Sequence, residues 1–180
     1  MEFIPAAARR YAEASFELAL KHDELDRWAS DLRALAEVLA EPGAAAFFES
    51  AGVPEAQKER VLKQVLEGIG PLAWNLACLL LSRGRLGLGP QIALAFQELV
   101  DGHRGVAHAE VTTAVPLTAS QAVAVATRLG ELTGKQVVVE AQEDPGIIGG
   151  LVARIGDQLI DGSTRAKLES LKRDLEGTVR

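Results

Sequence analysis

The segment from Gly130 to Lys135 is the part of the sequence that comes closest to a phosphate-binding loop. Such a loop needs four residues between its two glycines, and a serine or threonine after the lysine to hold magnesium. Here three residues separate Gly130 from Gly134, and Gln136 follows the lysine. The segment also ends a predicted helix and precedes a predicted strand, which is the reverse of the required order. We therefore interpret Gly134 as the C-cap of a helix.

Other residues that could bind a metal or act as a nucleophile are scattered along the chain. The histidines have no metal-ligand spacing, so we expect them at the surface. They are His22, His103 and His108. Asp157 and Asp161 flank a predicted hairpin, where aspartate is a turn former. Cys78 lies in an apolar run with no basic neighbour, which predicts a buried structural thiol. The sequence thus predicts no catalytic residue, no metal and no cofactor.

The composition excludes several classes of partner. The chain has 25 acidic and 19 basic residues and no basic stretch that could follow a phosphate backbone, so we expect no nucleic acid partner. A single cysteine excludes an internal disulfide and suits a reducing compartment. The most apolar stretch, residues 71–81, falls short of the roughly 20 residues of a membrane-spanning helix. We expect no direct membrane insertion, so any membrane association must come through partners.

Residues 1–105 have the spacing of successive helices joined by short turns. Hydrophobic residues three and four apart form a heptad seam from Leu25 to Leu39. Prolines mark the helix boundaries at Pro42, Pro54 and Pro71. Further side chains are expected to face inward: Val61, Leu62, Val65, Leu66, Ile92, Ala95, Phe96, Leu99 and Val100. Six helices of this kind predict a compact bundle.

Two of these helices have more apolar surface than one packing face needs. The helix over residues 6–21 has two adjoining stripes. One stripe contains Tyr11, Ala14, Ser15 and Leu18, and the other contains Ala8, Ala12, Phe16 and Ala19. The helix over residues 72–82 is apolar almost all round. Surplus apolar surface is either bundle core or a partner site, and both interpretations stay open at each position.

The periodicity changes to two after residue 105, which predicts a small α+β unit over residues 106–180. Alternation predicts a strand over residues 106–115, with Ala107, Ala109, Val111 and Val115 on one side. Thr118 and Gln121 fit a capping box, and Val123, Ala126 and Leu129 are the expected face of the following helix. Residues 137–139 predict a second strand, residues 151–155 and 158–160 a hairpin, and residues 163–175 a charged helix. The predicted fold class is mainly α, a six-helix bundle followed by this unit.

Several motifs resemble those of one protein family. The run VARIGDQLIDGSTR at residues 152–165, with Lys167 and Leu168 after it, closely resembles the signature of the delta subunit of F-type ATP synthases. This family includes the mitochondrial oligomycin-sensitivity-conferring protein. Residues 8–12 resemble the family's opening helix, and residues 75–76 and 84–86 resemble its fifth-helix segment. The resemblance covers essentially the whole chain.

The resemblance implies a non-catalytic stator subunit of a proton-translocating F-type ATP synthase. It implies that residues 1–105 bind the N-terminal segments of the alpha subunits on the catalytic head, and that residues 106–180 bind the b subunits of the peripheral stalk. One copy per complex would hold the head against the torque of the rotor. The implied location is peripheral, on the cytoplasmic face of the cell membrane.

The apolar stripes and the resemblance together predict an alpha-binding groove between the first and fifth helices. Its expected residues are Tyr11, Ala14, Leu18, Leu76, Leu79 and Arg83. A free-standing helical adaptor is a second hypothesis, and the motif at residues 152–165 argues against it. An enzyme with a small-molecule pocket between the domains is a third, and the absence of a convincing catalytic motif argues against that.

Overall fold

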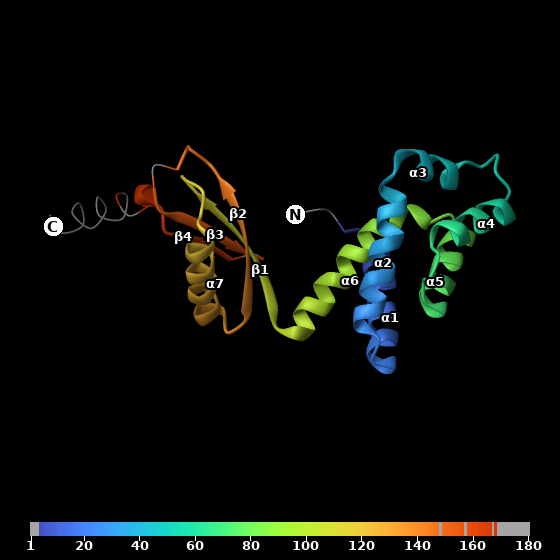
Figure 1. The fold of residues 1–180 in the computed structure, drawn as a ribbon, viewed down its shortest axis with the longest axis horizontal. Coiled ribbons are helices and arrows are strands. Elements are labelled where there is room, and N and C mark those ends of the chain that lie inside the picture. Colours follow the sequence, from blue (N-terminus) through green and yellow to red (C-terminus); the bar gives the residue numbers. More distant parts are fainter. Residues whose placement is uncertain (1–3, 148, 157, 167, 169–180) are drawn as a thin grey trace. The chain divides into compact units, whose positions relative to one another are not determined.

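The computed structural model describes residues 4–147, 149–156, 158–166 and 168. These residues are mainly helical and include a small four-stranded sheet, as the sequence predicts. The chain divides into two compact units, residues 1–100 and 101–180 (Figure 1). The first unit is helical, and the second contains the sheet.

Three helices of the first unit begin at a proline or directly after one. Pro42 and Pro71 are the first residues of their helices, and Pro54 immediately precedes another. Proline suits these positions because the first amides of a helix have no partner within the helix. The helices are α1 (Ala6–His22), α2 (Leu25–Ala40), α3 (Pro42–Glu49), α4 (Glu55–Val65), α5 (Pro71–Ser82), the short 3₁₀ helix η1 (Leu86–Leu88) and α6 (Gly89–Arg104).

The predicted heptad seam of α2 lies in the core of the first unit. Its buried side chains are Trp28, Leu32, Leu35 and Leu39. The Phe96 ring of α6 stacks on Trp28 at a centroid distance of 6.3 Å and meets Phe16 of α1 edge-on at 6.1 Å. These three rings tie α1, α2 and α6 together, and such aromatic pairs each contribute about 0.5–1.5 kcal/mol beyond area burial.

Small side chains make up the buried face of α1. Ala8, Ala12 and Ala19 are completely buried. Ser15 joins them with an exposed fraction of 2%, and its hydroxyl donates a hydrogen bond of 2.8 Å to the Tyr11 carbonyl oxygen. Ser15 was grouped with Tyr11, Ala14 and Leu18 from its spacing, and in the structure it is buried with the alanines of the other stripe. A buried hydroxyl is tolerated here because the carbonyl of the preceding turn satisfies it.

Two valines expected to face inward point to solvent instead. Val65 at the end of α4 is 51% exposed, whereas Leu62 and Leu66 are buried. Val123 is 66% exposed, although Leu129 on the same helix is buried. Each residue of an α-helix is rotated by about 100° from the residue before it. The side chains of residues three apart therefore differ in direction by about 60°. Val123 therefore lies about 120° from Leu129.

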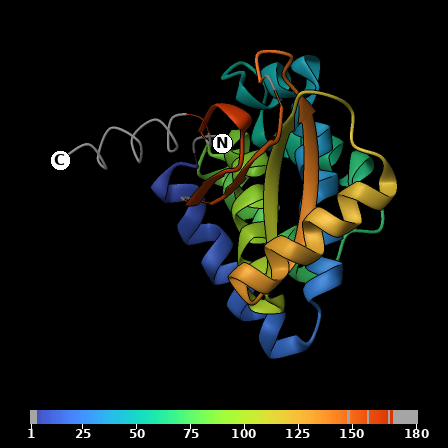
Figure 2. The same ribbon diagram turned by 90° about the vertical axis from the view of Figure 1, so that its left-hand side faces the viewer.

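The second unit contains a four-stranded sheet with one long crossover helix. Its elements are β1 (Val106–Thr113), α7 (Ala119–Thr133), β2 (Gln136–Glu143), β3 (Leu151–Ile155) and β4 (Gln158–Asp161). The strand order is β2-β1-β3-β4, with β1 and β2 parallel and the other neighbours antiparallel. Helix α7 lies along one face of the sheet (Figure 2). The core between them contains Ala109, Val111, Leu129, Val137 and Ala153.

The local signals at the ends of α7 are confirmed. Thr118 and Gln121 form both halves of a capping box. Gly134 is the C-cap with φ +68°, a left-handed conformation that glycine adopts without steric cost. This confirms the C-cap interpretation over a phosphate loop. The hairpin between β3 and β4 is also confirmed, with Ile155 opposite Gln158.

Two predicted elements have other bounds in the structure or lie partly outside the described residues. Strand β1 ends at Thr113, whose side chain is buried, so Val115 lies beyond it and is 67% exposed. Helix α6 continues to Arg104 and β1 starts at Val106, which leaves Gly105 alone between them. The predicted helix over residues 163–175 is helical from residues 164 to 166, and its greater part lies outside the described residues.

We expect Gly150→Ala to destabilise the second unit strongly. Gly150 has φ +87°, and an added Cβ would lie 2.5 Å from the Gly162 carbonyl oxygen. Left-handed strain and a clash with backbone together should cost more than about 2 kcal/mol. Gly102→Ala on α6 is the control, because its Cβ would meet nothing within 4 Å. Thermal melting should show a large decrease for the first variant only, and equal melting temperatures would contradict this prediction.

Candidate partner-binding surface

The three predicted site residues of α1 lie beside its buried face. Because a helical residue turns by about 100°, Tyr11, Ala14 and Leu18 fall roughly a quarter turn from the line of Ala8 and Ala12. Ala14 is exposed, Leu18 is 41% exposed, and Tyr11 is half-buried. Exposure at Ala14 and Leu18 leaves this stripe accessible within the first unit.

The predicted residues of α5 have a matching position on their own helix. Leu76 is half-buried, Leu79 is 43% exposed and Arg83 is exposed, while Ala73 and Ala77 on the neighbouring side are buried. Leu72, at the start of the same stripe, is also half-buried. Leu72 was not among the predicted site residues, although its spacing of four and seven from Leu76 and Leu79 was the available signal.

One hydrogen bond connects Tyr11 of α1 to the segment that follows α5. Arg85, in the turn after α5, donates from Nη1 to the Tyr11 hydroxyl over 3.4 Å. Arg85 was not among the predicted site residues, because a side chain in a turn has no helical periodicity to place it. We use the name α1–α5 surface for the six predicted residues, which are Tyr11, Ala14, Leu18, Leu76, Leu79 and Arg83.

The exposed leucines of the α1–α5 surface lie on two helices, and arginines occur on the first helix and directly after the second. Arg83 and Arg85 are both exposed, and Arg9 of α1 forms an ion pair of 3.2 Å with Glu98 of α6. Exposed ion pairs of this kind contribute little to stability, about 0–1 kcal/mol. A surface with this distribution suits an amphipathic helix whose apolar face meets the leucines and whose acidic end meets the arginines.

A pocket of about 530 Å³ adjoins Arg85. Its lining comes from α2, α3, α4, the end of α5, η1 and the turn between them: Leu39, Ala45, Phe48, Glu49, Lys58, Leu81, Gly84, Arg85, Leu86, Gly87 and Leu88. This pocket could not be predicted from the sequence, because its walls come from segments distant in sequence. Its charged side chains are Glu49, Lys58 and Arg85, which form no ion pair with one another in the structure.

The residues that were considered for chemistry have structural surroundings. Cys78 is half-buried where the sequence predicts full burial. Burial raises the pKa of its thiol, and the charge of Glu59 raises it further, which disfavours the reactive thiolate. The Ser163 backbone amide donates 2.9 Å to Asp161 Oδ1 and lowers the pKa of that carboxyl, with a smaller contribution from the serine side chain. Asp157 lies outside the described residues.

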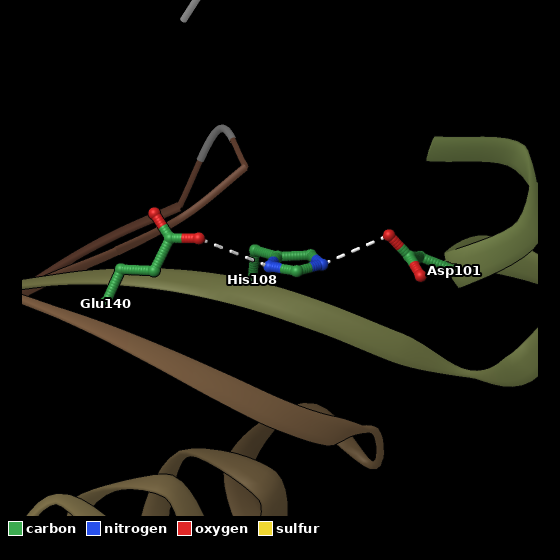
Figure 3. A network of polar contacts seen from close by, with 3 residues as sticks. All are labelled: Asp101, His108 and Glu140. Atoms are coloured by element: carbon green, nitrogen blue, oxygen red, sulfur yellow. Dashed lines mark hydrogen bonds and ion pairs between the residues drawn. The ribbon is translucent and has the colours of Figure 1, made fainter. Parts of the chain in front are cut away.

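The three histidines are exposed, as predicted. His108 nevertheless lies between two carboxylates (Figure 3). Its Nε2 is 3.1 Å from Asp101 Oδ2, and its Nδ1 is 3.6 Å from Glu140 Oε1. Asp101 is on the last turn of α6 and Glu140 is on β2, so the His108 side chain of β1 contacts both of these elements. Within the described ranges, no group of three or more histidine, cysteine or acidic side chains could hold a metal ion.

The sequence predicted no direct membrane insertion, and the length and hydropathy of the helices can be compared with that expectation. Among the described helices, none combines the length and the apolar character needed to cross a bilayer.

Comparison with characterised sequences identifies close relatives along nearly the whole chain. The chain is 38% identical to ATP synthase subunit delta of Dehalococcoides mccartyi over 170 residues, covering 94% of each chain. It is 37% identical to ATP synthase subunit delta of Gemmatimonas aurantiaca, covering 96% of this chain and 95% of the relative. The corresponding protein of Laribacter hongkongensis is 38% identical over 165 residues.

Comparison of folds identifies a solved chain whose fold is similar over nearly its whole length. A chain of the Toxoplasma gondii mitochondrial ATP synthase hexamer has the same fold, with a TM-score of 0.65 over 95% of this chain and 98% of that one, at 24% identity. The family described as ATP synthase delta (OSCP) subunit matches residues 7–175. The match includes both helices of the α1–α5 surface and all four strands of the sheet. The chain therefore belongs to the ATP synthase delta (OSCP) subunit family.

Proposed function

We propose that this protein joins the catalytic head of an ATP synthase to its peripheral stalk, with a different unit of the chain holding each partner. Family membership makes the protein a non-catalytic subunit of an ATP synthase. The finer proposal is that residues 1–105 bind the N-terminal segments of the alpha subunits and that residues 106–180 bind the b subunits. In this proposal each complex contains one copy of the chain, located on the cytoplasmic face of the cell membrane.

The physical task of such a subunit is to resist torque. Rotation of the central rotor exerts a reaction torque on the head, and the head must stay still for rotation to drive catalysis. The subunit must therefore bind both partners tightly, and nanomolar affinity corresponds to about 12 kcal/mol. Burial of apolar side chains at about 25 cal/mol per Å² supplies much of this before the costs of association are subtracted.

The α1–α5 surface is the single observation that favours the head-binding role of the first unit. We treat α1–α6 as a six-helix bundle because one cluster of buried side chains includes residues from all six helices and from η1. A bundle with its own complete core leaves Leu18 and Leu79 exposed, at 41% and 43%. Exposed leucines next to arginines support recognition of an amphipathic helix with acidic residues.

Reconstitution tests the proposed function directly. Membranes that retain the stalk but lack this chain should fail to bind added catalytic head and should not pump protons when ATP is supplied. Adding the purified chain should restore both properties, while the chain alone should not hydrolyse ATP. Equal head binding and equal proton pumping with and without the chain would contradict the proposal.

A further inference from the structure

Strand β2 forms one edge of the sheet in the second unit. All eight of its residues, Gln136 to Glu143, pair in continuous parallel register with β1. The Gln136 amide donates to the Gly105 carbonyl oxygen over 2.9 Å, and the Asp144 amide, directly after the strand, donates to the Thr113 carbonyl oxygen over 3.0 Å. The even-numbered amides therefore point towards β1.

The odd-numbered residues of β2 direct their main-chain groups away from the sheet. Successive residues of a strand point their amide and carbonyl groups to opposite sides, so those of Val137, Val139 and Ala141 point outward. Within the described residues, no strand pairs with β2 on this side. The edge thus presents a row of main-chain donors and acceptors at regular spacing.

Strand β2 has few of the features that protect a sheet edge from pairing. It contains no proline, and its eight residue pairs with β1 run without a bulge. It begins with three consecutive valines after Gln136. Long, regular, β-branched edges of this kind accept a further strand unless something covers or blocks them.

The side chains of β2 indicate the chemistry of a strand that would pair with it. Val138 is 42% exposed, and the Glu140 side chain is 66% exposed. Residues 136–144 contain Glu140, Glu143 and Asp144 and no basic residue. Figure 3 shows Glu140 on the same side of the sheet as His108. A matching strand would have an apolar side chain beside Val138 and a basic side chain beside Glu140.

We propose that the outer edge of β2 binds an extended segment of a stalk subunit by strand addition, and that this segment has an apolar and a basic side chain two residues apart on the same face. This inference rests on the proposed function, in which the second unit binds the stalk. The main-chain hydrogen bonds of the added strand provide affinity, and the valine and glutamate side chains select its sequence. A stalk segment bound in this way contacts the second unit along the length of β2, so it cannot pivot about a single contact.

Amide hydrogen exchange of the full chain, free and bound to the soluble part of the stalk subunit, tests the inference. The amides of Val137, Val139 and Ala141 should exchange much more slowly in the complex, by tenfold or more. The amides of Val138 and Glu140 already pair with β1 and should change less. Alternating protection would distinguish strand addition from general burial of the surface, because general burial would protect odd and even residues alike.

A matched pair of proline variants provides the second measurement. Ala141→Pro removes an outward amide hydrogen at a residue whose side chain is exposed, so it should weaken stalk binding at least tenfold and leave the melting temperature nearly unchanged. Gln142→Pro removes an amide that pairs with β1 and should lower the melting temperature instead. If Ala141→Pro also lowers the melting temperature, the exchange pattern of the unmodified chain decides whether a strand is added at β2.

The outcomes separate the two proposals. Alternating protection, together with weakened binding by a stable Ala141→Pro variant, supports strand addition. Stalk binding without protection of the odd-numbered amides, and equal affinity of Ala141→Pro, would overturn strand addition and leave the proposed function intact. If the unmodified chain does not bind the stalk subunit, both proposals are wrong.

Discussion

Ala14→Asp should reduce affinity for an alpha-subunit N-terminal peptide by about 100-fold or more while leaving the melting temperature of the protein almost unchanged. Ala14 is exposed, so its side chain makes no contribution to the core of the first unit. A carboxylate introduced there would be buried without a partner when the peptide binds. Burial of an unpaired charge costs several kcal/mol, and about 2.7 kcal/mol is a factor of 100 in affinity.

Ala12→Asp is the matched control for this experiment. Ala12 is on the same helix, two residues away, and is completely buried. The same substitution should therefore collapse the bundle, with a loss of more than about 4 kcal/mol of unfolding free energy. Calorimetric titration with the peptide and thermal melting of each variant are the two measurements.

The contrast between the variants distinguishes the interpretations that the sequence left open. Lost affinity with unchanged melting at Ala14 supports the α1–α5 surface as the head-binding site. Undiminished affinity of Ala14→Asp would place that site elsewhere on the first unit. A collapse in melting temperature at Ala14 would contradict the exposure of this side chain in the structure.

Removal of residues 106–180 should abolish binding of the soluble stalk subunit and leave alpha-peptide binding within about twofold of the full chain. The α1–α5 surface and the buried cluster of the first unit are made entirely by residues before 101. The deletion removes the whole sheet together with His108, whose contact with Asp101 connects the last turn of α6 to β1. We therefore expect that turn to fray and the rest of the helical signal to remain.

Pull-down with the stalk subunit, titration with the alpha peptide and circular dichroism measure the three parts of this prediction. The dichroism spectrum is the control, because a fragment that unfolds would lose both partners for a trivial reason. Stalk binding by the fragment at the affinity of the full chain would refute the assignment of the stalk site to residues 106–180. Loss of peptide binding by a folded fragment would instead show that the head site extends into the second unit.

The sequence alone determined the features that depend on neighbours along the chain. The seam from Leu25 to Leu39 has the helical period and lies buried in α2. The capping box at Thr118 and the C-cap at Gly134 depend on local backbone chemistry, and both are present. The motif over residues 152–165 was sufficient to indicate the family that the relatives confirm. Local signals of this kind need no knowledge of the packing partner.

Tertiary structure decided which apolar side chains are buried and which long-range contacts form. Val65 and Val123 have the hydrophobicity of core residues and are exposed, because no element among the described residues covers their side of the helix. Hydrophobicity measures the tendency of a side chain to be buried, whereas burial also requires another surface at that position. Long-range contacts likewise depend on which segments the fold brings together. Examples are the contact of Tyr11 with Arg85 and the contacts of His108 with Asp101 and Glu140. The open edge of β2 follows from strand order, which periodicity does not encode, because a strand has the same alternation at an edge as at the centre of a sheet.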